Sequence, residues 1–285
     1  MYTKRFIGIL FFLFALYGTC FAQDLVGFRL ALNSGVLADE FGKTDNPHKT
    51  VSLKSDAQSS KKFTPQLTCG VEGEILFQIS ESAFFGIEVD YSHLKGYNNN
   101  PPWYNYYLTE YYKVFQESGE YSGAPIQYNT RLINLAVNYK YFFFPEKEFQ
   151  PFVKFTGVVA FVGTDLSYKD SINSADNILY SRGTSNSSQR KWPVFHAGAG
   201  LGFSYDISDK TAFQIDGTVT VVNSGIVDGV PNFTYNKSEN LMSYNRRLSL
   251  TLQISAGLVY FIEVKKSRKS SGKTDDSLPF YRKLR

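Results

Sequence analysis

Apolar and polar residues alternate along most of this chain, and the last apolar segment shows the pattern best. In residues 248–260, LSLTLQISAGLVY, every even position is apolar, whereas five of the six odd positions from 249 to 259 are small or polar. A helix would mix both kinds of residue on one face, because its side chains repeat every 3.6 residues. A period of two instead predicts a β-strand with one apolar and one polar face.

Seven more segments show the same alternation, so the sequence predicts eight strands. The seven cover residues 25–33, 67–77, 84–92, 131–141, 151–161, 197–205 and 213–221. Their bulky face carries almost no charge, and the charged residues fall on the other face. These residues are Arg29, Glu72, Glu74, Glu88, Asp90, Lys140, Lys154 and Asp216.

Tight and long connections alternate strictly between the predicted strands. Tight turns are expected near residues 78–83, 145–150 and 206–211. The long polar connections cover approximately residues 35–62, 97–127, 164–191 and 223–245. Short periplasmic turns alternating with long outer loops are typical of outer-membrane β-barrels. We therefore predict an all-β fold, an eight-stranded antiparallel up-and-down transmembrane β-barrel.

The charge distribution decides which face of this barrel meets lipid. A charged side chain at the bilayer midplane costs ~2–4 kcal/mol, whereas charges inside a barrel can pair with one another. We therefore expect the bulky face to point outward, which also excludes a soluble barrel with an apolar interior. Side chains largely fill the interior of an eight-stranded barrel, so an open pore is not expected.

Aromatic residues flank every predicted tight turn. Residues 139–144 read YKYFFF and stand directly before Pro145. The others beside the turns are Phe77, Phe84, Phe85, Phe149, Phe152, Phe203, Tyr205 and Phe213, and the final strand ends in Tyr260 and Phe261. A buried aromatic cluster in a soluble sandwich could explain one such group but not its repetition at each turn. We expect all of them to form an interfacial girdle at the periplasmic rim.

The first 22 residues are predicted to be a secretory signal peptide. Lys4 and Arg5 precede a short apolar run, and small residues follow it up to Ala22, the expected cleavage site. The run is shorter than the ~20 residues that a membrane-spanning helix needs. Lipidation of Cys20 is the rival interpretation, although its motif is only partly met. Cleavage would leave Cys69 as a single cysteine, which excludes an intrachain disulfide.

The predicted barrel domain covers residues 23–262, and residues 263–285 form a basic periplasmic tail. The tail holds eight basic and three acidic residues, a net charge of +5, although the whole chain is only +4. The basic balance is thus confined to the tail and does not indicate a nucleic-acid-binding surface. Either the tail is a solvated disordered extension, or it tethers the barrel to anionic lipid headgroups, the cell wall or a periplasmic partner.

Residues 23–262 resemble the outer-membrane β-barrel domain family of Bacteroidetes, which includes PorT-like proteins. The resemblance is carried by the FAQ that ends the signal segment, by the hairpin INLAVNYKYFFFPEKEFQPFVKFTG and by the glycine-rich HAGAGLGFSYDIS. It implies an integral outer-membrane protein of a diderm bacterium and transfers no catalytic site. Such barrels often end at the last aromatic residue, here Phe261, whereas this chain continues.

The histidines are the best candidates for chemistry. Outer-membrane lipid A hydrolases and acyltransferases combine a histidine with a serine and an acid at the rim, as Ser92, His93 and Glu88 could. Neighbouring strand residues face opposite sides, however, which separates the nucleophile from its base. His196 is expected to be a hydrogen-bonded lumen residue, and His48 lies in a predicted loop. The sequence predicts no catalytic, cofactor-binding or metal-binding residues and no cofactor.

We expect a monomeric scaffold or binding module surrounded by the lipid bilayer and lipopolysaccharide, with no nucleic-acid partner. A protein or glycan could bind the outer loops, and a periplasmic partner could bind the tail. The loop at 97–127 is rich in tyrosine and contains Trp103, which could contact such a partner. These aromatics could also extend the strands and pack on one another. A lipid-modifying enzyme and a narrow channel are the alternative functions.

Overall fold

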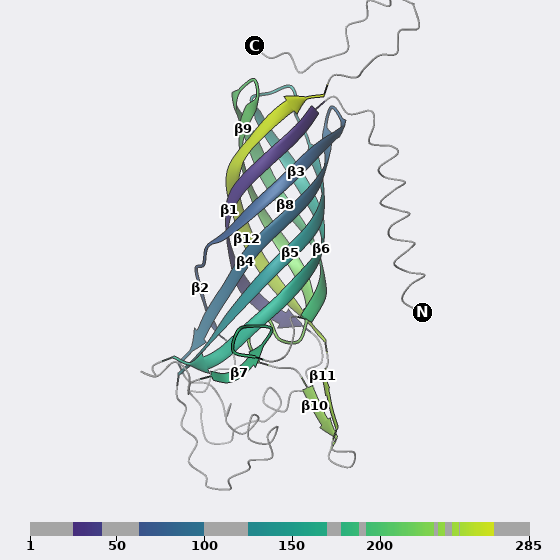
Figure 1. Ribbon diagram of the computed structural model, residues 1–285. Helices are drawn as coiled ribbons and strands as arrows, with labels where there is room; N and C mark the ends of the chain where they lie inside the picture. The colour runs from purple at the N-terminus through teal and green to yellow at the C-terminus, as the bar shows by residue number, and fades with distance from the viewer. Residues whose placement is uncertain are drawn as a thin grey trace, which may run out of the picture.

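The described part of the chain consists of β-strands and their connections (Figure 1). The computed structural model describes residues 25–41, 63–99, 125–169, 178–187, 192–230, 233–236, 241–244 and 246–264. The predicted signal peptide, most of the predicted loops at 35–62 and 97–127, parts of the other two loops and nearly all of the tail lie outside these ranges. Within the described ranges, no helix is long and apolar enough to cross a membrane.

Eight long strands form a closed antiparallel barrel. They are β1 (Leu25–Phe41), β3 (Gly70–Ser80), β4 (Ala83–Asn98), β5 (Ile126–Phe142), β6 (Phe149–Tyr168), β8 (Trp192–Ser208), β9 (Thr211–Ser224) and β12 (Arg247–Glu263). Each pairs with the next in this order. The ring closes where β1 pairs with β12, the purple and yellow strands that run side by side in Figure 1. The predicted fold class is confirmed.

The predicted tight turns are confirmed at one end of the barrel, which we call the turn end. They connect β3 to β4, β5 to β6, and β8 to β9. The first residue of β1 pairs with the last residue of β12, Leu25 with Glu263, so both ends of the described chain also lie at the turn end. The long connections all leave the opposite end, which we call the loop end (Figure 1).

Regular structure extends further into the predicted loops than the sequence indicated. β1 continues to Phe41, although a loop was expected from residue 35. Four short strands also fall in or beside predicted loops: β2 (Thr64–Gln66), β7 (Ile178–Arg182), β10 (Phe233–Asn236) and β11 (Leu241–Tyr244). β2 pairs with β4, β7 pairs with β6, and β10 pairs with β11. These segments lack the clean alternation of apolar and polar residues from which the eight strands were predicted.

The alternation of the strands separates an apolar exterior from a polar lumen. Leu30, Leu201 and Ile254 are 67%, 70% and 64% exposed, whereas Glu72 and Lys140 are 1% and 0% exposed. Exposed large apolar residues occur on all eight barrel strands. A soluble monomer rarely exposes more than a few hundred Å² of contiguous apolar surface. The wall therefore has the exterior of a membrane-embedded barrel, and the predicted assignment of the two faces is confirmed.

Candidate functional site

The lumen holds the charged residues that the sequence placed on the inward face. All eight are buried: Arg29, Glu72, Glu74, Glu88, Asp90, Lys140, Lys154 and Asp216. Each lies in a strand between outward apolar residues, so the period of two directs it inward. Buried charges are stable only when they are paired and hydrogen-bonded, and most of these eight meet that requirement.

Arg29 on β1 links carboxylates from two other strands. Its guanidinium pairs with Glu72 on β3, and its Nη2 donates to Asp216 Oδ2 on β9 at 2.7 Å. The same Nη2 donates to Ser255 Oγ on β12 at 2.8 Å, and Ser255 donates to Glu72 at 3.0 Å. Lys154 approaches Asp216 from β6, with Nζ 3.5 Å from Oδ1. This side of the network therefore connects five strands.

Two lysines complete the network on the other side of the lumen. Lys140 Nζ on β5 donates to Glu74 Oε2 at 2.6 Å, and Lys154 Nζ on β6 donates to Glu88 Oε2 at 3.0 Å. Asn138 Nδ2 bridges the two acids, at 2.8 Å from Glu74 and 2.6 Å from Glu88. Charge-assisted hydrogen bonds of this length are strong in a low-dielectric interior. The network therefore cross-links opposite walls of the barrel.

Gly198, Gly200 and Gly202 form a row of glycines on β8, which we call the glycine row. This row makes room inside the barrel. A Cβ atom at Gly200 would lie 2.6 Å from the carbonyl oxygen of Gly217 on β9. A Cβ atom at Gly202 would lie 2.5 Å from the ring of Phe152. Both distances are shorter than a Cβ contact allows. The glycines therefore permit the close approach of β9 and leave space in the lumen for the Phe152 ring.

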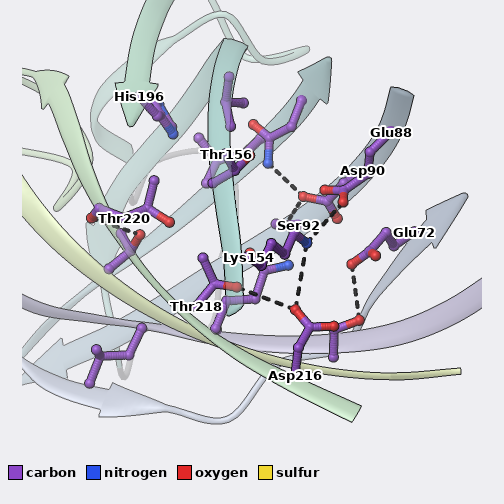
Figure 2. A pocket seen from close by; sticks show the side chains of 18 of the residues that line it. Glu72, Glu88, Asp90, Ser92, Lys154, Thr156, His196, Asp216, Thr218 and Thr220 are labelled. Carbon is purple, nitrogen blue, oxygen red and sulfur yellow. Dashed lines mark hydrogen bonds and ion pairs between the residues drawn. The ribbon is translucent and has the colours of Figure 1, made fainter. Parts of the chain in front are cut away.

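A small cavity lies in the lumen beside the charge network (Figure 2). Its volume is about 40 Å³, enough for a few water molecules. Glu72, Glu88 and Asp90 line it from β3 and β4, and Lys154 lines it from β6. Figure 2 shows His196 across the cavity from Glu72, Glu88 and Asp90.

The turn end of the lumen is closed by apolar side chains, which we call the turn-end plug. The plug consists of Leu76, Phe84, Phe142, Phe152, Ala212, Val259 and Phe261. The ring centroids of Phe84 and Phe142 are 5.4 Å apart, and those of Phe142 and Phe152 are 5.0 Å apart. Such spacing is typical of packed aromatic pairs.

The turn-end plug corrects the prediction for the aromatic residues. Tyr139 and Tyr141 point outward and are exposed, as a membrane-facing girdle requires, whereas Phe142 is buried in the plug. Phe84, Phe152 and Phe261 also point inward, so the prediction that every aromatic belongs to the girdle is wrong. Neighbouring strand residues face opposite sides, and an aromatic run therefore supplies both the girdle and the plug.

The loop end of the lumen is closed by a second cluster, the loop-end plug. It consists of Leu94, Ile126, Tyr128, Leu132, Ala160, Val162, Leu166, Tyr180, Val194, Val222, Ile226, Val227 and Val230. The segment after β9 folds into it, and Thr130 Oγ1 donates to the Val227 carbonyl at 2.8 Å. Gly229 has a φ of 77°, which a side chain would strain, so glycine permits this inward turn. Arg247 pairs with Asp228 at 3.3 Å beside it.

The structure separates the candidate catalytic residues as predicted. Ser92 points into the lumen and donates to Asp90, whereas His93 is half-buried on the outward side and its Nε2 bonds Asn129. His196 is a buried lumen residue, yet its Nε2 has no hydrogen-bond partner among the described residues. The lumen position of His196 is as predicted, and the predicted hydrogen bond of this atom stays a prediction. His48 and Trp103 lie outside the described residues.

One cluster of three acidic side chains in the described part of the chain was not predicted from the sequence. One carboxylate oxygen from each of Glu72, Glu74 and Glu88 lies within 4.8 Å of the other two, a spacing that could hold a metal ion. Glu74 is paired across the β3–β4 hairpin with Glu88, so strand register was the signal that could have found it. These three carboxylates already form ion pairs with Arg29, Lys140 and Lys154. The pairs favour a structural charge network over a metal ion held by the three glutamates.

Comparisons with known proteins find likeness in structure alone. No family model and no curated protein matches the sequence. The outer membrane protein OprG from Pseudomonas aeruginosa has a TM-score of 0.43 at 9% identity, over 85% of this chain and 97% of that one. The outer membrane protease OmpT from Escherichia coli has a TM-score of 0.38 at 8% identity, over 84% and 97%. Ail, the attachment invasion locus protein of Yersinia pestis, has a TM-score of 0.35 at 8% identity, over 84% and 99%.

These likenesses are too distant to transfer an activity or a site. The closed ring of paired strands, its apolar exterior and its polar interior define the fold from this chain alone. By these criteria the chain is an eight-stranded antiparallel β-barrel of the outer-membrane type.

Proposed function

We propose that this chain is an integral outer-membrane protein whose closed barrel anchors a scaffold or binding module, and that it is not an enzyme. The observation that carries the proposal is the filled lumen. An apolar plug closes each end, and the charge network between the plugs leaves a cavity of about 40 Å³. A barrel filled in this way can hold binding segments at a membrane, whereas transport would require both plugs to move.

The exterior and the topology support the outer membrane as the location. A closed barrel satisfies every backbone polar group of its wall, which a strand exposed to lipid requires. Its even number of antiparallel strands, with short turns at one end and long connections at the other, is the arrangement of bacterial outer-membrane barrels. On this arrangement the turn end faces the periplasm and the loop end faces outward.

The loop end offers surface for a protein or glycan partner. β4 and β5 stay paired as far as Asn98 and Ile126, and β6 continues to Tyr168. β7 widens the wall there, and β10 and β11 form a separate hairpin. The barrel thus provides a rigid base for the connections that carry the candidate partner-binding residues.

The periplasmic tail is the second place where a partner could bind. Its net charge of +5 suits anionic lipid headgroups, the cell wall or an acidic protein surface. A PorT-like part in protein export is one form of this function, and the resemblance of the hairpin and glycine-rich segments supports it. In that form the barrel would fix a protein-binding tail at the inner surface of the outer membrane.

Crosslinking in intact outer membranes tests the proposal. We would compare the full chain with a variant that ends at Val264, after confirming by heat-modifiable gel migration that both barrels fold. A partner lost from the shortened chain would be assigned to the tail, and a partner kept by both chains would be assigned to the loops.

A conductance measurement could contradict the proposal. The filled lumen predicts no steady ion current when the purified full chain is inserted into planar bilayers. A reproducible current, together with no captured partner for either chain, would contradict the proposal and favour the narrow channel. Hydrolysis or acyl transfer on lipid A by the same preparation would favour the enzyme instead.

A further inference from the structure

The middle of the lumen carries more negative than positive charge. Its buried basic residues are Arg29, Lys140 and Lys154. Its buried acidic residues are Glu72, Glu74, Glu88, Asp90 and Asp216. Each of the three basic residues already forms at least one ion pair with these acids. With all five acids ionised, two negative charges are in excess in the part of the lumen that the structure describes.

Asp90 is the acid that the network leaves without a cation. It accepts hydrogen bonds from Asn33 Nδ2, Asn134 Nδ2 and Ser92 Oγ, all of them uncharged donors. No ion pair joins it to another residue in the described ranges, although it is 2% exposed. A buried carboxylate without a positive partner is strongly unfavourable, so Asp90 is stabilised either by a proton or by a bound cation.

Two polar atoms beside the same cavity also have no partner within the described chain. They are the Oδ1 of Asn134 and the Nε2 of His196, and each of these residues is 8% exposed. Both residues line the cavity with Asp90. Buried polar atoms are nearly always hydrogen-bonded in native proteins. These two atoms therefore indicate, independently of the acids, that water or an ion occupies the cavity.

We propose that this cavity binds one Ca²⁺ ion, or a similarly hard divalent cation, through the carboxylate of Asp90, the Oε1 of Glu88 and the Oδ1 of Asn134. Lys154 and Asn138 contact the other oxygen of Glu88, Oε2. A divalent ion matches the excess of two negative charges. Ca²⁺ takes six to eight oxygen ligands in flexible geometry, and bound waters fill the positions that the protein leaves open. His196 Nε2 accepts a hydrogen bond from one of these waters.

The surrounding residues are consistent with an ion placed between β4, β5 and β8. Lys154 also lines the cavity, but its charge is offset by Glu88 and Asp216. The cavity of about 40 Å³ has room for an ion and a few waters. The two plugs separate the cavity from both ends of the barrel, so the ion enters during folding and exchanges slowly afterwards.

Metal analysis of refolded protein tests the site. The full chain would be refolded in detergent with Ca²⁺, Mg²⁺ or Zn²⁺ as the added metal, dialysed against chelator, and its bound metal measured. We expect about one Ca²⁺ per chain after dialysis, and a higher unfolding temperature than that of chain refolded in chelator.

Two variants and a matched control locate the ion within the lumen. Asp90→Asn removes the unpaired charge without changing the side-chain shape, and we expect at least a tenfold loss of retained Ca²⁺. Asp228→Asn is the matched control, because it also neutralises a buried lumen acid, but one that pairs with Arg247 away from the cavity. It should retain Ca²⁺ as the unchanged chain does. Asn134→Asp should make the unfolding temperature more dependent on Ca²⁺.

Three results would overturn the proposal. The first is an unchanged chain that retains no divalent metal after refolding. The second is equal retention of Ca²⁺ by the unchanged chain and by Asp90→Asn. The third is retention of Zn²⁺ alone with loss on His196→Ala, which would replace the oxygen-ligated site with a nitrogen-ligated one. If Asp90→Asn fails to fold, the metal content of the unchanged chain still decides between the first result and the proposal.

Discussion

The outside and the inside of this barrel are built from the same strands under different rules. Most outward residues are apolar and face lipid rather than a specific partner, so many different apolar residues can take each outward position. Inward residues each need a specific partner from another strand, as Arg29 does with Glu72 and Asp216. The comparison predicts that equal changes will have unequal effects on the two sides, since only the lumen depends on pairing and exact fit.

The largest difference is expected for a charged residue. Arg29→Ala would leave buried carboxylates unpaired, and we expect it to lower the free energy of unfolding by ~3–5 kcal/mol. Arg131→Ala changes an exposed arginine on the outer side of β5 and should cost at most ~1 kcal/mol. Reversible urea unfolding in lipid vesicles would measure both. Similar losses for the two variants would show that the network does not stabilise the barrel.

A smaller difference is expected for two phenylalanines three residues apart on β6. Phe152 is buried in the turn-end plug, and Phe152→Ala should cost ~3 kcal/mol because it leaves a cavity that the walls cannot close. Phe155 is 55% exposed on the outer side, where lipid can fill the space that alanine leaves. The same unfolding measurement should therefore give a distinctly smaller loss for Phe155→Ala. A larger loss at Phe155 would contradict the plug.

The smallest difference is expected for added methyl groups. Gly200→Ala places a Cβ atom 2.6 Å from a backbone oxygen, so we expect a cost of ~1–3 kcal/mol from displaced strands. Gly217→Ala is the matched control, because nothing lies within 4 Å of its Cβ position. That variant should be neutral or slightly stabilising. Equal effects in thermal unfolding would show that the glycine row does not set the approach of β8 and β9.

The sequence predicted the features that depend on the alternation of apolar and polar residues, which repeats every two positions. Runs such as LSLTLQIS assign each residue to a face, and the eight inward charges follow from that assignment. The plugs were missed because runs such as YFFF are apolar on both faces, so the pattern cannot separate Tyr141 from Phe142. The pairing of Arg29 with Asp216 was also missed, because it depends on how the closed ring brings distant strands together. The inward course of residues 225–230 has no periodic signal at all.

The assignment of the two faces is the central claim, and one pair of neighbours on β12 tests it most directly. Leu252 is 41% exposed on the outer side, whereas Gln253 is half-buried and shares the inward side of the strand with the buried Thr251 and Ser255. Leu252→Arg would place a guanidinium in the hydrocarbon layer, at a cost of ~2–4 kcal/mol at the midplane. Gln253→Arg would add a positive charge to a lumen with excess carboxylate. Reversible unfolding in lipid should show the larger loss for Leu252→Arg, and a larger loss for Gln253→Arg would mean that the barrel is inside out.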